Sequence, residues 1–425
     1  MSAEQFLTDF HSVAEIGATA HNGVDRQAAT EEDRQTREWF RSFSAARGWE
    51  IRVDGIGNQF ALVDFVPGGP HILLGSHLDS QPLGGRFDGA YGVIAALHAA
   101  DRIAQRVAAG AEAPRHNLAV VNWFNEEGGR FAPSIMGSSV FAGLMDETEM
   151  LAVTDLAGVS VREALTEIGY LGTDPRPEIA GYAEIHIEQG RILERETVPV
   201  GAVDYSWYTQ KLDIEVLGEQ SHTGATAMAD RHDALVGAAQ VIMKVHEVTS
   251  HWEPEALVSS VGQLTLEPNS PIVVARRVHL VADLRAADKE IVRAARDRLI
   301  ADMEAIAAQS GLTINATDFD VRDNQYYPES GIQLTERVAA DLGLAARRIR
   351  TMAGHDSVAM NRIVPTTMLF IPSVDGVSHC EREFSTDEDM AAGVDVLTEV
   401  AWRMLNGELD PGAERAVAAS AGAFA

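Results

Sequence analysis

The sequence lacks the features that mark secreted and membrane proteins. It contains one cysteine, Cys380, among 425 residues, so no disulfide can form within the chain. No hydrophobic run approaches the length of a membrane span. The first residues, MSAEQFLTDFHSVAEIG, include early acidic side chains and lack the apolar segment of a secretory signal. These absences predict a cytoplasmic protein that does not enter a membrane.

Positive charge is also scarce. Lys and Arg total 34 against 63 Asp and Glu, which gives a formal net charge of −29. Such a chain repels phosphate backbones and anionic membranes, so nucleic acid is a poor candidate partner. Solubility is the simplest explanation of the acidity. A substrate that carries a carboxylate would need local cationic groups or metal ions to overcome the net charge.

The length and the pattern of apolar residues predict an α/β protein of two domains. The first forty residues have a helical pattern, with Thr30 as a candidate cap for the helix that ends at Gly48. Short apolar runs at 71–76 and 118–124 are typical of buried strands, and helical spacing lies between them. This order predicts a sheet with helices on its faces.

A second pattern occupies residues 210–326. It reads strand, helix, strand, strand, helix, strand, which is the order of an open-faced sandwich with one layer of helices on one sheet. The α/β pattern then resumes. We therefore expect a catalytic domain with a mixed sheet, made from residues 1–209 and 327–425, with the βαββαβ domain inserted between these segments. The Ala- and Gly-rich tail after residue 409 is expected to fray.

Four polar clusters follow predicted strands, where open α/β sheets place their sites. They are GSHLDSQPLGGRFDG (75–89), NEEGGRF (125–131), EIHIEQG (184–190) and VDGVSHCERE (374–383). Imidazoles and carboxylates are ligands for Zn, Mn, Co or Ni, and two such ions a few Å apart need about five protein ligands. The clusters supply that number. The candidates are His77, Asp88, Glu127, His186 and His379.

Two further acidic residues have candidate roles beside the metals. Glu126 and Glu127 are adjacent, and adjacent side chains diverge, so one carboxylate can bind metal while the other stays free to transfer a proton. Asp79 lies two residues after His77 and is placed to hold that histidine as a hydrogen-bond acceptor. Each motif alone has an ordinary structural explanation, and their joint occurrence favours the metal site.

Together these motifs resemble the M20-type metallohydrolase superfamily, in the branch of N-carbamoyl-L-amino acid hydrolases, allantoate amidohydrolases and β-ureidopropionases. The resemblance covers nearly the whole chain. It rests on the clusters above and on SHTGATAM (221–228), DLR (283–285) and AGHDS (353–357). It implies that Asp88 bridges two divalent metal ions, that the other four candidates complete the ligand set, and that Glu126 acts as acid and base.

The resemblance also assigns residues to the substrate. It implies that Gln189, His222, Arg285, Gly354 and His355 contact a ureido acid, with Arg285 holding a carboxylate and His222 stabilising an oxyanion. In relatives this histidine comes from the partner subunit. A homodimer is therefore implied, with the inserted domain serving as dimerisation and lid domain.

The expected reaction is hydrolysis of the carbamoyl C–N bond of an N-carbamoyl amino acid or related ureido acid, with release of an amino acid, ammonia and carbon dioxide. One departure concerns the substrate. Relatives usually have asparagine thirteen positions before the DLR arginine, and this chain has Ile272 there. Allantoate or ureidoglycolate amidohydrolase and N-acyl amino acid hydrolase therefore stay as alternatives, beside a non-enzymatic relic of the fold.

Overall fold

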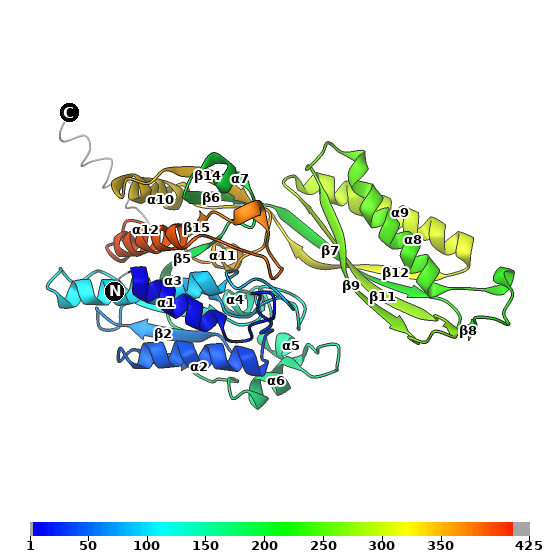
Figure 1. Cartoon of the computed structure of the whole chain (residues 1–425), viewed down its shortest axis with the longest axis horizontal. Helices are drawn as coiled ribbons and strands as arrows, with labels where there is room; N and C mark the ends of the chain where they lie inside the picture. The colour runs from blue at the N-terminus through cyan, green and yellow to red at the C-terminus, as the bar shows by residue number, and fades with distance from the viewer. Residues whose placement is uncertain (1–2, 411–425) are drawn as a thin grey trace. The chain divides into compact units, whose positions relative to one another are not determined.

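The structure is a computed structural model that describes residues 3–410, and the chain forms two compact units (Figure 1). The large unit consists of Met1–Tyr205 and Tyr326–Ala425, and the small unit consists of Ser206–Gln325. The boundaries lie a few residues earlier than the sequence suggested. The tail expected to fray lies almost wholly outside the described residues. Among residues 3–410, no helix is long and apolar enough to cross a membrane.

The large unit is built on a mixed sheet of nine strands, in agreement with the predicted fold class. Eight strands follow the order β1-β2-β4-β3-β5-β15-β6-β13, and β14 pairs with β6. Strands β4, β3, β5 and β15 are mutually parallel. Strand β2 pairs antiparallel with β1 and with β4, and β6 pairs antiparallel with β15. The strands are β1 (Glu50–Val53), β2 (Gln59–Val63), β3 (His71–His77), β4 (Asn117–Trp123), β5 (Ile179–Ile187), β6 (Val200–Ser206), β13 (Gln325–Tyr326), β14 (Ala346–Thr351) and β15 (Thr366–Ile371).

Helices cover this sheet and form its main hydrophobic core. Helices α3 and α12 pack on each other and on β3 and β5, and apolar residues of α1 and α10 join the same core. The central strands are buried along their whole length, which explains their continuous apolar runs. The helices of the large unit are α1 (Ala3–Ala14), α2 (Glu31–Ala45), α3 (Ala90–Ala108), α4 (Met136–Phe141), α5 (Glu147–Ala152), α6 (Val161–Glu167), α7 (Ile192–Glu196), α10 (Glu329–Asp341), α11 (Asp356–Met360), α12 (Asp387–Leu405) and the 3-10 turn η3 (Val374–Gly376).

The helical prediction for the first forty residues is wrong between α1 and α2. Helix α1 ends at Ala14, and the turn that follows contains Gly17, which has φ of +72°. A Cβ atom on Gly17 would lie 2.7 Å from the carbonyl oxygen of Asp25. The predicted cap of α2 is confirmed, because the Thr30 side chain accepts a hydrogen bond from the backbone N–H of Asp33.

The small unit is an antiparallel sheet of order β12-β7-β11-β9, with α8 and α9 packed on one face. Residues along β7 and β11 alternate between buried and partly exposed, as expected for a sheet with one covered face. The predicted βαββαβ order is confirmed. Its elements are β7 (Tyr208–Leu217), β8 (Ser221–His222), η1 (Met228–Asp230), α8 (Ala234–Glu247), η2 (Val248–His251), β9 (Val258–Glu267), β10 (Val273–Val274), β11 (Arg277–Ala286), α9 (Lys289–Ser310) and β12 (Thr313–Arg322).

Candidate metal centre

The metal-ligand candidates meet at the carboxyl ends of parallel strands in the large unit. His77 is the last residue of β3, His186 lies near the end of β5, and Glu127 follows β4. Asp88 lies in the loop between β3 and α3, and His379 lies in the loop that follows β15 and η3. Parallel neighbours end at the same edge of a sheet, so residues far apart in the chain come together there.

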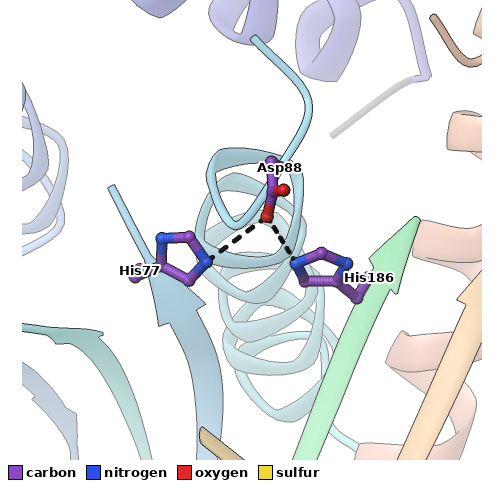
Figure 2. Close-up of side chains that lie close together, drawn as sticks. All are labelled: His77, Asp88 and His186. Carbon is purple, nitrogen blue, oxygen red and sulfur yellow. Dashed lines mark ion pairs between the residues drawn. The ribbon is translucent and has the colours of Figure 1, made fainter. Parts of the chain in front are cut away.

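Asp88 lies between the imidazole rings of His77 and His186 (Figure 2). Its Oδ1 atom lies 3.5 Å from Nε2 of His77 and 2.9 Å from Nε2 of His186. All three side chains are buried. Gly89, next in the chain, has φ of +60°, and a Cβ atom there would lie 2.3 Å from the His77 ring. A glycine at this position therefore lets the loop approach the imidazole closely.

A second group shares Asp88. The Oδ2 atom of Asp88 and Oε2 of Glu127 each lie 3.3 Å from Nε2 of His379. Potential ligand atoms of His77, Asp88 and His186 lie within 4.8 Å of one another, as do those of Asp88, Glu127 and His379. The two triads thus have one residue in common, and each of its carboxylate oxygens faces a different triad. This is the arrangement that a pair of neighbouring cations requires.

The hydrogen bonds of two histidines fit a metal site. Nδ1 of His77 lies 3.0 Å from the backbone carbonyl oxygen of Asp79, and Nδ1 of His186 lies 2.9 Å from that of Ile187. A carbonyl can only accept, so Nδ1 of each ring carries a proton and Nε2 is left as the nitrogen that faces Asp88 and can bind a metal ion. Two imidazoles held in this way on either side of a carboxylate fit divalent metal ions.

The pKa values of the clustered side chains reflect several carboxylates gathered in one place. Burial disfavours ionisation of Asp88, but the surrounding imidazoles, His186 foremost, outweigh it and hold the Asp88 pKa well below its usual value. The negative charge of Glu127, with Asp88, raises the pKa of His379 to about 10. A site that stabilises positive charge this strongly is suited to cations.

Glu126 is the buried carboxylate beside this cluster. Its Oε2 atom lies 3.5 Å from Nε2 of His77, and it belongs to neither triad. Burial, together with the neighbouring carboxylates, raises the Glu126 pKa to about 8. A carboxyl group with this pKa can both accept and release a proton near neutral pH.

The prediction for Asp79 needs a correction in detail. The close contact of His77 Nδ1 is with the backbone carbonyl of Asp79, and the carboxylate oxygen is farther away, at 3.6 Å. The Asp79 side chain instead accepts hydrogen bonds from the backbone N–H groups of Glu126 and Glu127, both at 3.3 Å. The chain turns sharply enough after His77 that the backbone reaches the ring before the side chain can.

The large unit also contains three of the predicted substrate residues. Gln189 donates a hydrogen bond from Nε2 to Asp88 Oδ2 at 2.6 Å, and its Oε1 atom is buried without a partner among the described residues. The His355 ring packs edge-on against His186 with centroids 4.5 Å apart. Gly354 directly precedes His355 in the turn before α11. The structure therefore brings Gln189 and His355 to the metal candidates.

The other two predicted substrate residues lie in the small unit and are far from each other. His222 is in β8, paired with Val273 beyond the Arg277 end of β11, and Arg285 lies near the opposite end of that strand. The guanidinium of Arg285 is paired with Asp283 at 2.8 Å. Nδ1 of His222 accepts backbone N–H groups of Gly224 and Ala225, so the ring is oriented with Nε2 outward.

Two residues of the site received no role from sequence reasoning. Glu383 and Ser378 both lie within VDGVSHCERE and flank His379. Glu383 accepts hydrogen bonds from the backbone of Phe87 and Asp88, and Ser378 contacts Asp88 and Gln189. Their position in a cluster already singled out was a signal. Their partners, however, are 189 to 296 residues away in the sequence and could not be deduced from it.

The fold and the site define a two-domain α/β protein with a candidate dinuclear metal centre, and known proteins share this architecture. The profile of peptidase family M20/M25/M40 matches residues 73–403. A hydrolase of Mycolicibacterium smegmatis, whose name specifies no substrate, is 48% identical over 96% of this chain and 94% of its own. N-carbamoyl-L-amino-acid amidohydrolase of Rhizobium meliloti is 33% identical over 93% of this chain and 95% of its own.

A solved structure agrees with these relatives. The crystal structure of an amidase of the hydantoinase/carbamoylase family from Burkholderia vietnamiensis has a TM-score of 0.91 and 33% sequence identity. The similarity covers 96% of this chain and 98% of that chain. The chain belongs to peptidase family M20/M25/M40 and, within it, to the branch of carbamoylases and allantoate amidohydrolases.

Proposed function

We propose that the chain is a metal-dependent amidohydrolase that cleaves the carbamoyl C–N bond of an N-carbamoyl amino acid or related ureido acid. The products are an amino acid, ammonia and carbon dioxide. The single observation that carries this proposal is the buried carboxylate of Glu126 beside two potential metal triads that share Asp88. The single cysteine supports a reducing, cytoplasmic location.

His77, Asp88 and His186 would hold one divalent ion, and Asp88, Glu127 and His379 would hold the other. The donor set of imidazoles and carboxylates suits Zn, Mn, Co or Ni. When bound, such a pair supplies a Lewis acid and lowers the pKa of water to near neutrality.

Glu126 handles the proton. Its backbone N–H donates to Asp79 Oδ1 at 3.3 Å, and its carboxylate lies at the edge of the cluster. From there it orients the attacking water, takes its proton, and passes that proton to the departing nitrogen. Its buried position, with Oε2 3.5 Å from Nε2 of His77, supports both halves of this transfer because it lies beside the metal site without belonging to either triad.

Gln189 recognises the carbamoyl group. Its Nε2 atom must be the donor toward Asp88, since a carboxylate cannot donate, and this fixes Oε1 on the other side of the amide. Oε1 is a buried acceptor without a partner among the described residues. The terminal NH₂ of a carbamoyl group is a donor of the kind that such an acceptor requires.

Arg285 and His222 serve the rest of the substrate. The guanidinium of Arg285 captures the carboxylate in a bidentate manner, and Nε2–H of His222 donates to the oxyanion. Since Nδ1 of His222 accepts two backbone N–H groups, its proton lies on Nε2, which supports the role of donor. Gly354 and His355 complete the substrate surface.

The spacing of His222 and Arg285 supports a homodimer. Strand β11 runs from Arg277, near the β8 end of the sheet, to Arg285 near the other end (Figure 1). The part of β11 from Arg277 to Arg285 is about 27 Å long at roughly 3.4 Å per residue. A small ureido acid cannot span that length, so His222 acts on a substrate held by Arg285 of another copy. The small unit thus serves as dimerisation and lid domain.

The second candidate function is hydrolysis of a related substrate: allantoate, ureidoglycolate or an N-acyl amino acid. Ile272, which stands where relatives usually have asparagine, is 65% exposed and cannot hydrogen-bond a carboxylate. Its backbone carbonyl accepts the N–H of Thr223, next to His222. An apolar side chain in this position favours a substrate with an apolar group over allantoate or ureidoglycolate, and N-acyl amino acids stay in the comparison for the same reason.

Ammonia release from carbamoyl amino acids, 3-ureidopropionate and allantoate, and amino acid release from N-acyl amino acids, test the proposal. Each assay is run with added Zn, Mn, Co or Ni. The matched variant is Glu126→Gln, which keeps the shape of the side chain but cannot take up a proton. Turnover should fall about 10²- to 10⁴-fold while the metal content stays at two per chain. Full activity of Glu126→Gln, or a wild-type chain that holds two metals and hydrolyses none of the panel, would sink the proposal.

A further inference from the structure

Glu383 connects the two loops on which the second triad depends. Its Oε1 atom accepts hydrogen bonds from the backbone N–H groups of Phe87 and Asp88, both at 3.0 Å. Its Oε2 atom accepts the hydroxyl of Ser378 at 2.6 Å. One carboxylate, 3% exposed, thus holds the backbone of Asp88 on one side and the residue before His379 on the other.

The surrounding chain is built to admit this carboxylate. A Cβ atom on Gly85 would lie 2.0 Å from Oε1 and 2.1 Å from Cδ of Glu383, so a side chain there would displace the carboxylate. The glycine at position 85 therefore gives Glu383 access to the Asp88 loop. The backbone N–H of Glu383 also donates to the carbonyl of Cys380 at 3.1 Å, which closes the turn that follows His379.

The two triads differ in how firmly their histidines are held. His77 and His186 are buried residues of strands β3 and β5, and a backbone carbonyl accepts Nδ1–H of each ring. His379 belongs to no strand or helix, has φ of +56°, and its side chain is 51% exposed. A non-glycine residue in the left-handed region holds its conformation only where its surroundings impose it. Those surroundings are the loop that Glu383 ties down.

From this asymmetry we infer that Glu383 is a positioning residue for the second metal ion, the one between Asp88, Glu127 and His379, and contributes much less to the first. The inference rests on the proposed two-metal function. Glu383 does not itself belong to either triad. It acts through the backbone of Asp88, which both triads share, and through the loop of His379, which serves the second triad alone and is the source of the selectivity. Residues that orient metal ligands in this way typically contribute about 10- to 100-fold to metal affinity.

Stepwise binding of Co²⁺ to the metal-free full-length protein tests this, followed by calorimetry and by visible absorbance. Wild type should take up two ions per chain. In Glu383→Ala the first ion should bind with near wild-type affinity, whereas the second should bind about 10- to 100-fold more weakly. Glu383→Gln should restore most of the loss, because its Oε1 still accepts both backbone N–H groups and its amide can donate to Ser378 Oγ.

Asp54→Ala is the matched control for a merely structural effect. Asp54 is also a buried carboxylate that accepts two backbone N–H groups, those of Ile56 and Asn58, but it touches neither loop of the metal centre. This variant should lose thermal stability and keep the ratio of the two Co²⁺ affinities. Ser378→Ala keeps the hydrogen bonds of Glu383 to the backbone of Phe87 and Asp88 but removes the hydroxyl that contacts Glu383, Asp88 and Gln189. It should weaken the second ion more than the first, so it carries the test if Glu383→Ala does not fold.

The outcomes separate this inference from the proposed function. Equal Co²⁺ affinities in wild type, Glu383→Ala and Ser378→Ala would overturn the inference alone, as would a parallel loss at both sites. A wild-type protein that binds fewer than two ions would overturn the two-metal function and the inference with it.

Discussion

The carboxylate of Asp79 accepts a hydrogen bond from the backbone N–H of Glu126 at 3.3 Å. Its other oxygen accepts the N–H of Glu127 at the same distance. Asn125, just before the pair, has φ of +49°, so the chain enters this turn in the left-handed region. Asp79 therefore holds the backbone from which Glu127 reaches the triad with Asp88 and His379, and from which Glu126 lies beside His77.

Asp79→Ala should lower kcat/KM about 10- to 100-fold, because both glutamates lose the group that holds their backbone. The kcat/KM of Asp79→Asn should lie between those of the wild type and Asp79→Ala. The amide oxygen of Asn can accept a hydrogen bond from one of the two N–H groups, but its NH₂ group cannot accept one from the other. Steady-state kinetics, with metal content measured on the same samples, checks the order. Equal rates for wild type and both variants would show that the Asp79 side chain is dispensable.

Three of the metal-ligand candidates could be predicted from the sequence because their position depends only on the order of the strands. His77, Glu127 and His186 each lie at or just beyond the end of a buried strand, and β3, β4 and β5 are adjacent and parallel. Once buried apolar runs identify such strands, the polar residues after them must meet at one edge. The role of the Asp79 side chain could not be read in this way, since it depends on how tightly one turn curves.

Contacts between distant loops are the part that sequence reasoning missed. The hydrogen bond from the backbone of Asp88 to Glu383 depends on the folded loops and leaves no periodic pattern in the sequence.

Two strands of the fold, β13 and β14, were also missed. The first has two residues, and the second, ARRIRT, places arginines where apolar residues would identify a strand. Short or polar strands at the margin of a sheet give too weak a hydrophobic signal.

Ile272→Asn should shift substrate preference. Ile272 is exposed, and its backbone carbonyl accepts the N–H of Thr223, the residue after His222. An amide at this position adds a hydrogen-bonding group where the present side chain has none. We expect kcat/KM to rise about 10-fold for a ureido acid with a second carboxylate and to fall several-fold for one with an apolar side chain. Ile272→Val, which stays apolar, is the control and should keep the wild-type preference. An unchanged ratio of kcat/KM values in Ile272→Asn would exclude this residue from specificity.

His98 should make the stability of the chain depend on pH below neutrality. This imidazole of α3 is fully buried, with Nε2 2.9 Å from Asp9 of α1, and burial lowers its pKa from 6.5 to about 4. The folded chain therefore binds this proton less readily than the unfolded chain. The contribution is fully present above pH 6.5, falls as the pH drops, and levels off near pH 4.

Between pH 7 and pH 5, the free energy of unfolding should thus fall by about 2 kcal/mol through this group. The side chain in His98→Gln cannot titrate. Between pH 7 and pH 5, the free energy of unfolding of this variant should therefore fall less than that of the wild type, and the difference should be about 2 kcal/mol whatever the stability of the variant at pH 7. Urea denaturation of both proteins at the two pH values measures the difference. If both proteins lost the same stability, protonation of His98 would not be the cause.

His222 and Arg285 should complement each other between subunits. Neither Arg285→Ala nor His222→Ala should be active alone, because each removes one of the two groups at every site. When the two variants are unfolded, mixed in equal amounts and refolded, half of the dimers contain one copy of each, and one site in each such dimer has both wild-type groups. About a quarter of wild-type activity should return if the histidine comes from the partner subunit. If both groups acted within one chain, no mixture could recover activity, since every site would lack either the arginine or the histidine.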